Sequence, residues 1–405
     1  MEAAVKEPEV GYPLELSRYA GRINDTDAHE WVPPESYVEQ FGKITQTFAD
    51  IGMRAMEALK REVTSRRLDV DETNEITKKT AWFTKGPYAP GSYDMAKRLE
   101  IMDFCGVDKQ LIFAGGVPIS CLFLLGNIDD KNMMPEITGD RRKYAYDCIH
   151  AYNEWAVRQH EWSARLRTVA VLVGNSVDEL YADAKRLIDR GIRAIWLPSS
   201  ILPGGKSPAH EDHDRLWDLL QGSNTSVLLH IGNEAGFYAT LGWRQANAFL
   251  GWQESQEVQL DPWTLGNLHM PSQSFLNCMI SGGVFERFPR LRFGAIETGA
   301  EWLGPMAQTM DRWATALGSK WTARFSMLPS DYVRRNVRVT GFPDEPIDIH
   351  IEHHGLDDCY CYASDYPHFE GGTDPMGFWS QRLDRLGEGV KEKFFVKNAE
   401  WIMPD

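Results

Sequence analysis

Short apolar segments of strand type alternate with longer segments of helical periodicity along most of the chain. The predicted strands are 22–29, 109–113, 167–173, 194–197, 226–230, 291–296 and 358–364, and an eighth is placed near 266–269. The predicted helices between them include 95–104, 147–166, 177–190, 214–220 and 271–282. Strands that alternate with helices of this length form βαβ units around a parallel sheet. The number of strands favours a closed α/β barrel over an open sheet.

The length of 405 residues allows two or three average domains or one large barrel with insertions. We expect 1–20 to form a polar arm that lies across the body or across a neighbouring subunit, and 21–405 to form the barrel. Segments near 44–90, 115–137 and 232–263 do not fit a bare barrel and are predicted insertions. The last two follow predicted strands and should lie on the carboxyl-terminal face, where barrel enzymes build their sites.

The segment 232–263 is rich in aromatic residues: Phe237, Tyr238, Trp243, Phe249, Trp252 and Trp263. Such a segment is typical either of a packed surface subdomain or of a lid over a pocket for an apolar or aromatic ligand. The residues alone leave both interpretations open.

The composition excludes some classes of protein. A formal net charge of −15 argues against nucleic acid and anionic membranes as partners, because both attract basic surfaces. The six cysteines form no C-x-x-C pair, which favours reduced thiols over a disulfide framework. The first residues lack the apolar core of a secretory signal, and no apolar run is long enough to span a membrane. We therefore expect a cytoplasmic protein with a small-molecule substrate.

Residues of metal-binding type lie at the ends of predicted strands. Asp27 and His29 are two positions apart, so both point to one face of a strand. His230 ends an apolar strand, and Asp365 follows the buried strand 358–364, where an unpaired carboxylate would be costly. His269 comes just before a predicted helix. Each signal is weak alone, because a capping or surface residue, a core histidine or an ion pair is the more common explanation for such a residue.

The order of these pieces gives them specificity. The pieces are D-x-D-A-H at 25–29, L-L-H at 228–230, G-G-V-F-E-R-F-P-R-L at 282–291, E-T-G-A-E-W at 297–302 and S-D-Y-P-H at 364–368. Together they resemble the amidohydrolase superfamily, in the amidohydrolase-related branch that includes aminocarboxymuconate-semialdehyde decarboxylase. The resemblance runs from about 22 to 403 apart from the insertions, and the third and fifth pieces are specific to that branch.

The resemblance implies a distorted (β/α)8 TIM barrel with lid segments on its carboxyl-terminal face and one divalent metal. The implied metal ligands are Asp27, His29, His230 and Asp365, with His269 and Asp365 as catalytic acid/base residues. The predicted substrate-binding residues are Trp31, Glu297, Trp302 and His368. Two imidazoles and two carboxylates suit Zn²⁺, which we expect first, and they also suit Mn²⁺ or Fe²⁺. We expect a homo-oligomer, or a hetero-oligomer with a homologous chain.

The implied function is a metal-dependent hydrolase or non-oxidative decarboxylase that acts on a small aromatic or carboxylated compound. Many relatives carry a glutamate three residues after the first histidine, where this chain has Val32. Glu30 is adjacent to His29 and should face away from the site by alternation. Val32 cannot bridge two metals, so an alternative is the mononuclear, accessory subunit of a two-component non-haem metal monooxygenase. A binding barrel without metal is the third and least favoured interpretation.

Overall fold

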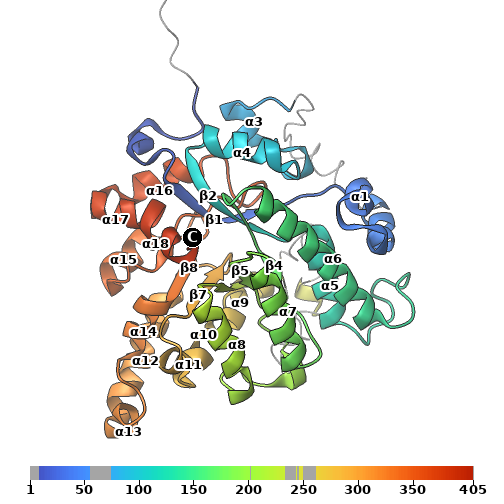
Figure 1. Cartoon of the computed structure of the whole chain (residues 1–405). Helices are drawn as coiled ribbons and strands as arrows, with labels where there is room; N and C mark the ends of the chain where they lie inside the picture. Colours follow the sequence, from blue (N-terminus) through green and yellow to red (C-terminus); the bar gives the residue numbers. More distant parts are fainter. Residues whose placement is uncertain are drawn as a thin grey trace, which may run out of the picture.

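A ring of short parallel strands surrounded by helices forms the body of the computed structural model (Figure 1). The structure describes residues 9–54, 74–200, 202–232, 243, 246–249 and 261–404. The strands are β1 (Ile23–His29), β2 (Val107–Phe113), β3 (Leu166–Thr168), β4 (Ala170–Val171), β5 (Ala194–Trp196), β6 (Ser226–His230), β7 (Arg292–Ile296), β8 (Val337–Thr340) and β9 (Tyr360–Cys361). All strand pairs are parallel and join neighbours in the sequence.

The strands form two hydrogen-bonded groups, β1-β2-β3 and β4-β5-β6-β7-β8-β9. Only Val169 separates β3 from β4, and its N–H donates to the Ile112 carbonyl at 2.9 Å. β3 and β4 are therefore two pieces of one strand, which leaves eight strand positions around the barrel. This arrangement confirms the predicted α/β barrel.

The seam between β9 and β1 is joined by separate hydrogen bonds instead of a regular ladder. The N–H of Thr26 donates to the Tyr362 carbonyl at 3.1 Å, and the N–H of Asp365 donates to the Asp27 carbonyl at 2.8 Å. A single parallel bridge pairs Ala28 with Tyr366. The seam thus brings β1 against the S-D-Y-P-H segment at 364–368, which the sequence predicts to be functional.

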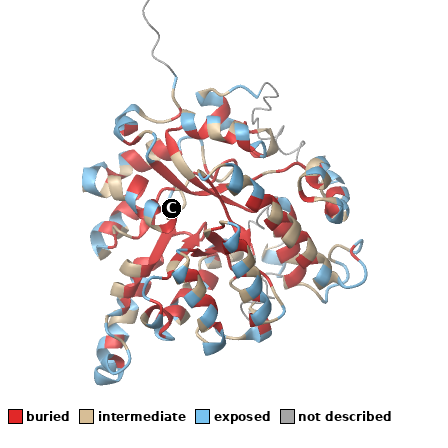
Figure 2. Cartoon of the chain, viewed as in Figure 1, coloured by how far each residue is buried: buried red, intermediate tan, exposed pale blue. Residues whose placement is uncertain are grey.

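The helices surround the strands and expose their outer faces, while the strands are buried (Figure 2). They are α1 (Tyr37–Phe41), α3 (Lys78–Phe83), α4 (Met95–Phe104), α5 (Gly116–Gly126), α6 (Arg141–Trp162), α7 (Val177–Asp189), α8 (Asp214–Gly222), α9 (Pro262–Asn267), α10 (Met270–Ser281), α11 (Val284–Arg287), α12 (Leu303–Leu317), α13 (Ser319–Thr322), α14 (Pro329–Asn336), α15 (Ile347–His354), α16 (Pro375–Leu383), α17 (Glu388–Glu392) and α18 (Asn398–Ile402). Side-chain caps define several starts: Ser176 accepts from the Glu179 N–H at α7, and Asp94 accepts from the Ala96 N–H at α4.

The position predicted for the eighth strand is wrong. Residues near 266–269 follow or belong to α9, which begins after the Asp261 N-cap, and the missing strand is β8. The sequence V-R-V-T of β8 is short and directly follows two arginines and an asparagine, so its alternation is masked by polar residues. The guanidinium of Arg338 lies over the Trp401 ring at 4.1 Å, which accommodates the arginine inside a buried strand.

The described part of the predicted arm, from residue 9, packs on the body of its own chain. The N–H of Gly11 donates to the Phe104 carbonyl at 2.8 Å, and the Trp82 indole donates to the Gly11 carbonyl at 2.7 Å. Arg18 pairs with Glu388 at 2.9 Å. These residues thus lie across the body of their own chain, and a contact of the arm with a neighbouring subunit stays a prediction.

The segments predicted as insertions are described unevenly. Residues 116–126 form α5, whose buried side chains belong to the core. In the aromatic segment 232–263, the predicted lid residues Phe237, Tyr238 and Trp252 lie outside the described residues, and Trp243 is 67% exposed. The lid therefore stays a prediction.

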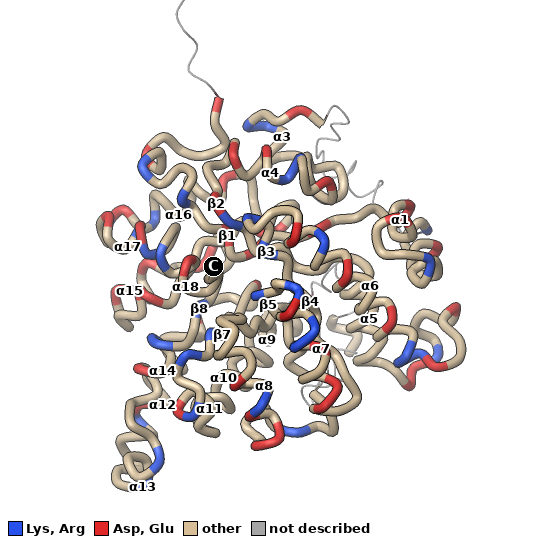
Figure 3. The backbone as a smooth tube through the Cα atoms, viewed as in Figure 1, with Lys and Arg blue, Asp and Glu red and all other residues tan. Residues whose placement is uncertain are grey.

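The surface and the thiols agree with the composition. Acidic and basic residues are mixed along the outer helices (Figure 3). All six cysteines are free, and five of them are buried. Among the described residues, no helix combines the length and apolar character that crossing a bilayer requires.

Candidate metal centre

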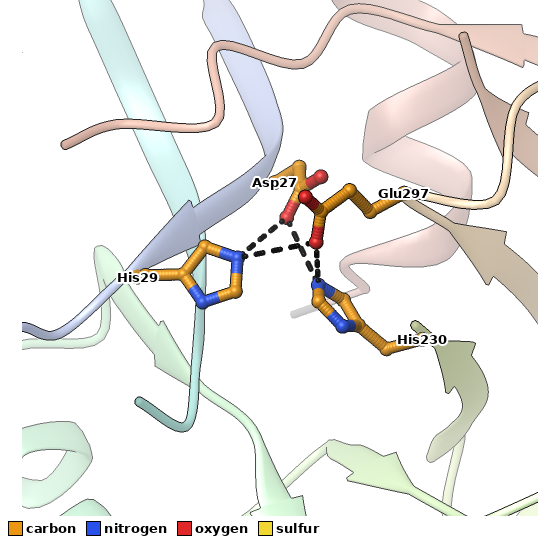
Figure 4. A group of neighbouring side chains, drawn as sticks. All are labelled: Asp27, His29, His230 and Glu297. Carbon is orange, nitrogen blue, oxygen red and sulfur yellow. Dashed lines mark ion pairs between the residues drawn. The ribbon is translucent and has the colours of Figure 1, made fainter. Parts of the chain in front are cut away.

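Four polar side chains from three strands converge at the carboxyl ends of the strands (Figure 4). Asp27 and His29 project from the same side of β1, as their spacing predicted. His230 is the last residue of β6, and Glu297 directly follows β7. Because parallel strands end at the same edge of the barrel, these residues meet although they are far apart in the sequence.

The distances between the donor atoms match one metal coordination sphere. His29 Nε2 and His230 Nε2 lie 3.4 and 3.5 Å from Asp27 Oδ1. Glu297 Oε2 lies 3.1 Å from His230 Nε2 and 3.9 Å from His29 Nε2. Ligands bonded tetrahedrally to Zn²⁺ at about 2.0–2.1 Å stand about 3.3 Å apart. The observed separations bracket this value.

Asp365 flanks the same cluster from the β9–β1 seam. Its Oδ1 lies 3.7 Å from His29 Nε2 and 2.7 Å from His368 Nδ1. His29, Glu297, Asp365 and His368 form a second group of donors within 4.8 Å of one another. His29 and Glu297 belong to both groups, so the two are parts of one centre.

The cluster is buried, and several of its polar atoms lack a hydrogen bond. Among the described residues, Asp27 Oδ1, His29 Nε2, His230 Nε2 and Asp365 Oδ1 make no hydrogen bond of normal geometry, although Asp365 Oδ1 forms a close pair with His368 Nδ1. Buried polar atoms of this kind are costly unless something satisfies them. A divalent cation would satisfy them together, because histidine nitrogens and carboxylate oxygens suit Zn²⁺ and Mn²⁺. The residues present therefore fit a metal.

Different features favour metal binding by His29 and His230. Burial, with His368 and His230 as the next contributors, lowers the pKa of His29 well below its ordinary value of 6.5. His29 is thus neutral at physiological pH, the form that binds a metal. The Nδ1 of His230 lies 2.9 Å from the Ile231 carbonyl, and its ring packs 4.3 Å from the Phe113 ring. The Nδ1 proton placed there leaves Nε2 as the donor atom.

Two of the carboxylates come from residues with left-handed backbone conformations. Glu297 and Asp365 both have φ of +52°, an unfavourable region for a residue other than glycine. The N–H of Glu297 donates to Thr340 Oγ1 at 2.9 Å, and the N–H of Asp365 donates to the Asp27 carbonyl at 2.8 Å. Strain of this kind collects at functional sites, where the surrounding contacts maintain it.

Two predicted substrate residues, Trp31 and His368, lie beside this centre, and a third, Trp302, immediately precedes α12. The Trp31 ring stands edge-on to the His368 ring at 5.3 Å and to the Phe369 ring at 6.2 Å. Trp302 is 7% exposed, and its indole N–H donates to the Gly299 carbonyl at 2.8 Å. Trp302 thus anchors the loop that carries Glu297, which leaves its predicted substrate contact untested.

His269, the predicted acid/base residue, is outside both donor groups. It is half-buried and immediately precedes α10. Burial lowers its pKa from 6.5, and the opposing effect comes from Glu301, in the loop after β7. Its imidazole is therefore neutral at physiological pH.

The sequence interpretation did not include Glu297 among the ligands. It assigned Glu297 to the substrate pocket, whereas the structure places this carboxylate in both donor groups. A signal was present, because Glu297 directly follows the predicted strand 291–296 in the same way that His230 ends its strand. The prediction that Glu30 faces away is consistent with its contacts: its carboxylate accepts from the N–H groups of Val32 at 2.8 Å and Gly115 at 2.7 Å.

Comparisons with known proteins agree with this fold. No curated protein matches the chain. Among solved structures, an amidohydrolase from Mycobacterium avium subsp. paratuberculosis K-10 superposes with a TM-score of 0.66 at 16% identity, over 95% of this chain and 99% of that one. A 5-carboxyvanillate decarboxylase from Sphingomonas paucimobilis gives 0.56 at 14% identity, over 94% and 98%.

A second 5-carboxyvanillate decarboxylase, from Novosphingobium aromaticivorans DSM 12444, gives a TM-score of 0.54 at 18% identity, over 94% of this chain and 96% of that one. At these identities the likeness establishes a shared fold, the amidohydrolase barrel. A sequence model of the amidohydrolase family matches residues 125–402, which is more than half of the chain. The match includes His230, Glu297 and Asp365. The chain belongs to the amidohydrolase family.

Proposed function

We propose that the chain is a metal-dependent non-oxidative decarboxylase or hydrolase that acts on a small aromatic carboxylate. The observation that supports this most strongly is the convergence of buried, unsatisfied donor atoms at distances suited to one divalent cation. Asp27, His29, His230 and Glu297 would hold the cation, with Asp365 beside them. This assignment adds Glu297 to the ligands expected from the sequence.

The solved relatives support the choice of substrate and metal. The Novosphingobium enzyme was crystallised with manganese and 4-hydroxy-3-methoxy-5-nitrobenzoic acid. A dihydroxybenzoic acid decarboxylase from Polaromonas sp. JS666 was crystallised with manganese and 2-nitroresorcinol. Both bound molecules are small substituted phenols. We therefore propose that the single metal is either Mn²⁺ or Zn²⁺, and that hydroxylated aromatic acids are the substrate class to test first.

The metal and the surrounding residues would have different roles in the reaction. A bound divalent cation would act as a Lewis acid toward an oxygen of the substrate or of water. Asp365 would exchange a proton at the edge of the cluster, and the neutral imidazole of His269 would be a second proton acceptor. Trp31, whose ring stands edge-on to the buried His368, would present an aromatic face against which a flat ring can pack.

The comparisons do not support the alternative of an accessory oxygenase subunit. The relatives are decarboxylases and amidohydrolases, and the donor atoms described here suit a self-sufficient centre. Val32, at the position where the resemblance implies a glutamate in many family members, is 1% exposed and packs in the core. The expected homo-oligomer remains a prediction, which light scattering on the purified protein would test.

The test is a substrate screen on protein loaded with Mn²⁺ or Zn²⁺. Hydroxylated benzoic acids are offered, and release of CO₂ is followed together with the aromatic product; esters, lactones and amides of the same acids are offered in parallel. Turnover of an acid with release of CO₂ supports decarboxylation, and turnover of an acyl derivative supports hydrolysis. Failure of both series with protein shown to bind the metal would overturn the proposal.

A further inference from the structure

One carboxylate near the metal centre has no place in the donor groups. Asp25 lies two residues before Asp27 on the same face of β1 and is 1% exposed. Its Oδ1 accepts from the Ser364 N–H at 2.9 Å and the Asp27 N–H at 3.3 Å. Its Oδ2 accepts from the Ser364 hydroxyl at 2.5 Å and the Gln110 amide at 2.8 Å. All four contacts bring a donor to the carboxylate.

The contact to Gln110 continues into a buried arginine. Gln110 Oε1 accepts from Arg98 Nη1 at 3.1 Å, and Arg98 Nη2 donates to the His29 carbonyl at 2.7 Å. An arginine can only donate, so Gln110 must present its oxygen to Arg98 and its NH₂ group to Asp25. The direction of every hydrogen bond in this network is therefore fixed.

The network contacts the backbone beside three predicted metal ligands. Asp25 holds the N–H of Asp27 and both donors of Ser364, the residue directly before Asp365. Arg98 holds the carbonyl of His29. These ligands lie on the two sides of the β9–β1 seam, where a single bridge replaces a regular ladder. Hydrogen bonds from the side chains of Asp25 and Arg98 therefore hold the backbone at the seam, in place of ladder hydrogen bonds between strands.

We propose that Asp25 is a positioning residue: through Ser364 it fixes the separation between β1 and the Asp365 loop, and through Gln110 it ties β1 to β2 and Arg98, so that the donor atoms are arranged before a metal binds. This inference rests on the proposed metal centre. Asp25 would not contact the metal. Residues that orient metal ligands in this way typically change metal affinity by about 10–100-fold when they are replaced.

The first variant is Asp25→Asn, which keeps the size of the side chain. It brings an NH₂ group against the Ser364 hydroxyl and the Gln110 amide, so at least one donor faces another donor. The second variant combines Asp25→Asn with Gln110→Glu. The new carboxylate at position 110 accepts from the new amide at position 25 and from Arg98, which restores complementarity and moves the same charge to the neighbouring side chain.

The readout is the dissociation constant of Mn²⁺ and of Zn²⁺, measured on metal-free protein by competition with a chelator. We expect Asp25→Asn to weaken binding by about tenfold or more and the double variant to recover most of that loss. Ser364→Ala removes one donor to Asp25 with little change in volume. Ser364→Ala should weaken metal binding by a smaller factor than Asp25→Asn. If Asp25→Asn does not fold, the metal affinity of Ser364→Ala tests the proposed role of Asp25.

Asn336→Ala is the matched control. Asn336 is also fully buried, and its amide donates to the Leu291 carbonyl at 2.7 Å, before β7 and at the opposite end of the strand from Glu297. This variant should lower the melting temperature and leave metal affinity unchanged. The inference is overturned if Asp25→Asn or Ser364→Ala binds metal like the wild type, or if the double variant binds no better than Asp25→Asn. A wild-type protein that binds no metal would instead overturn the proposed function itself.

Discussion

His230 Nε2 lies 3.1 Å from Glu297 Oε2, although one residue ends β6 and the other follows β7. The two strands pair in parallel with His230 opposite Ile296, so the register places the two side chains at nearly the same height. This contact, with Asp27 and His29 across the barrel, is the structural basis for a metal centre in this chain.

Glu297→Gln tests the ligand that the sequence interpretation assigned to the pocket. The amide keeps the shape of the side chain but loses the charge that pairs with a cation. We expect metal affinity to fall by at least about 1.4 kcal/mol, which is tenfold. Isothermal titration of metal-free protein with Mn²⁺ measures the change. Glu301→Gln, an exposed position in the same loop, should bind like the wild type, and equal affinity in both variants would remove Glu297 from the centre.

Asp365→Asn should reduce turnover while the fold is retained. A residue that exchanges a proton in the reaction typically contributes about 10²–10⁴-fold to the rate, and we expect kcat to fall within this range. Steady-state kinetics measures kcat, and circular dichroism checks the fold. Asp358→Asn is the control, because Asp358 is partly exposed and pairs with Lys393 at 2.7 Å. A fully active Asp365→Asn enzyme contradicts the proposed role.

Trp31→Leu should weaken substrate binding more than it slows turnover. An aromatic pair contributes about 0.5–1.5 kcal/mol beyond the apolar area that it buries, so KM for an aromatic acid should rise by about two- to tenfold. The comparison of KM with kcat separates this effect from damage to the metal centre. Trp162→Leu, at a half-exposed position, should leave both constants unchanged. An unchanged KM in Trp31→Leu would place the aromatic surface elsewhere.

The raised pKa of Glu345 predicts that the stability of the fold depends on pH. Burial raises the pKa of Glu345 from 4.5 to about 8, and Glu301 and Asp344 add to this shift. The folded state then holds a proton that the unfolded state has released, so the contribution of Glu345 to stability is present below pH 4.5 and is lost as the pH rises toward 8. The upper limit of the slope for one group is about 1.4 kcal/mol per pH unit.

Glu345→Gln should remove this loss, because an amide does not titrate in this pH range. The amide oxygen can still accept from the Ala300 N–H, which donates to Glu345 at 2.8 Å in the wild type. Urea unfolding of the metal-free proteins at several pH values between about 5 and 8 measures the difference. The stability of the wild type should fall relative to that of Glu345→Gln as the pH rises. Glu352→Gln, at an exposed position, is the control, and parallel curves for wild type and Glu345→Gln would contradict the expectation.

Much of the fold and part of the site could be predicted from particular residues. The alternation of strand and helix types predicted the barrel, and β6 and α4 have the expected bounds. The positions of Asp27, His29 and His230 at strand ends follow from local properties, whereas their role as ligands is what the family resemblance implies. Glu297 also follows a predicted strand, but its approach to His230 depends on the register of β7 against β6, and the sequence interpretation therefore assigned it to the substrate pocket. β8 was missed because arginines precede and interrupt its short apolar alternation.

The network around Asp25 could not be predicted for a similar reason. Asp25, Gln110 and Ser364 are polar residues in predicted strands or at their ends, and nothing in the sequence indicates that their side chains contact one another. Only the closure of the barrel brings β1 between β2 and the Ser364 segment, where the three side chains meet. Contacts across a barrel seam depend on the whole chain.

The most direct test of the central claim is a titration of metal-free protein with Mn²⁺ and with Zn²⁺, followed by calorimetry and by the melting temperature. We predict one tightly bound cation per chain. A free cation concentration of about 100 times Kd should stabilise the fold by about 2.7 kcal/mol. Replacement of His230 by alanine should abolish this stabilisation. If the wild type binds neither cation, or if His230→Ala binds them equally well, the cluster of Asp27, His29, His230 and Glu297 is not a metal centre.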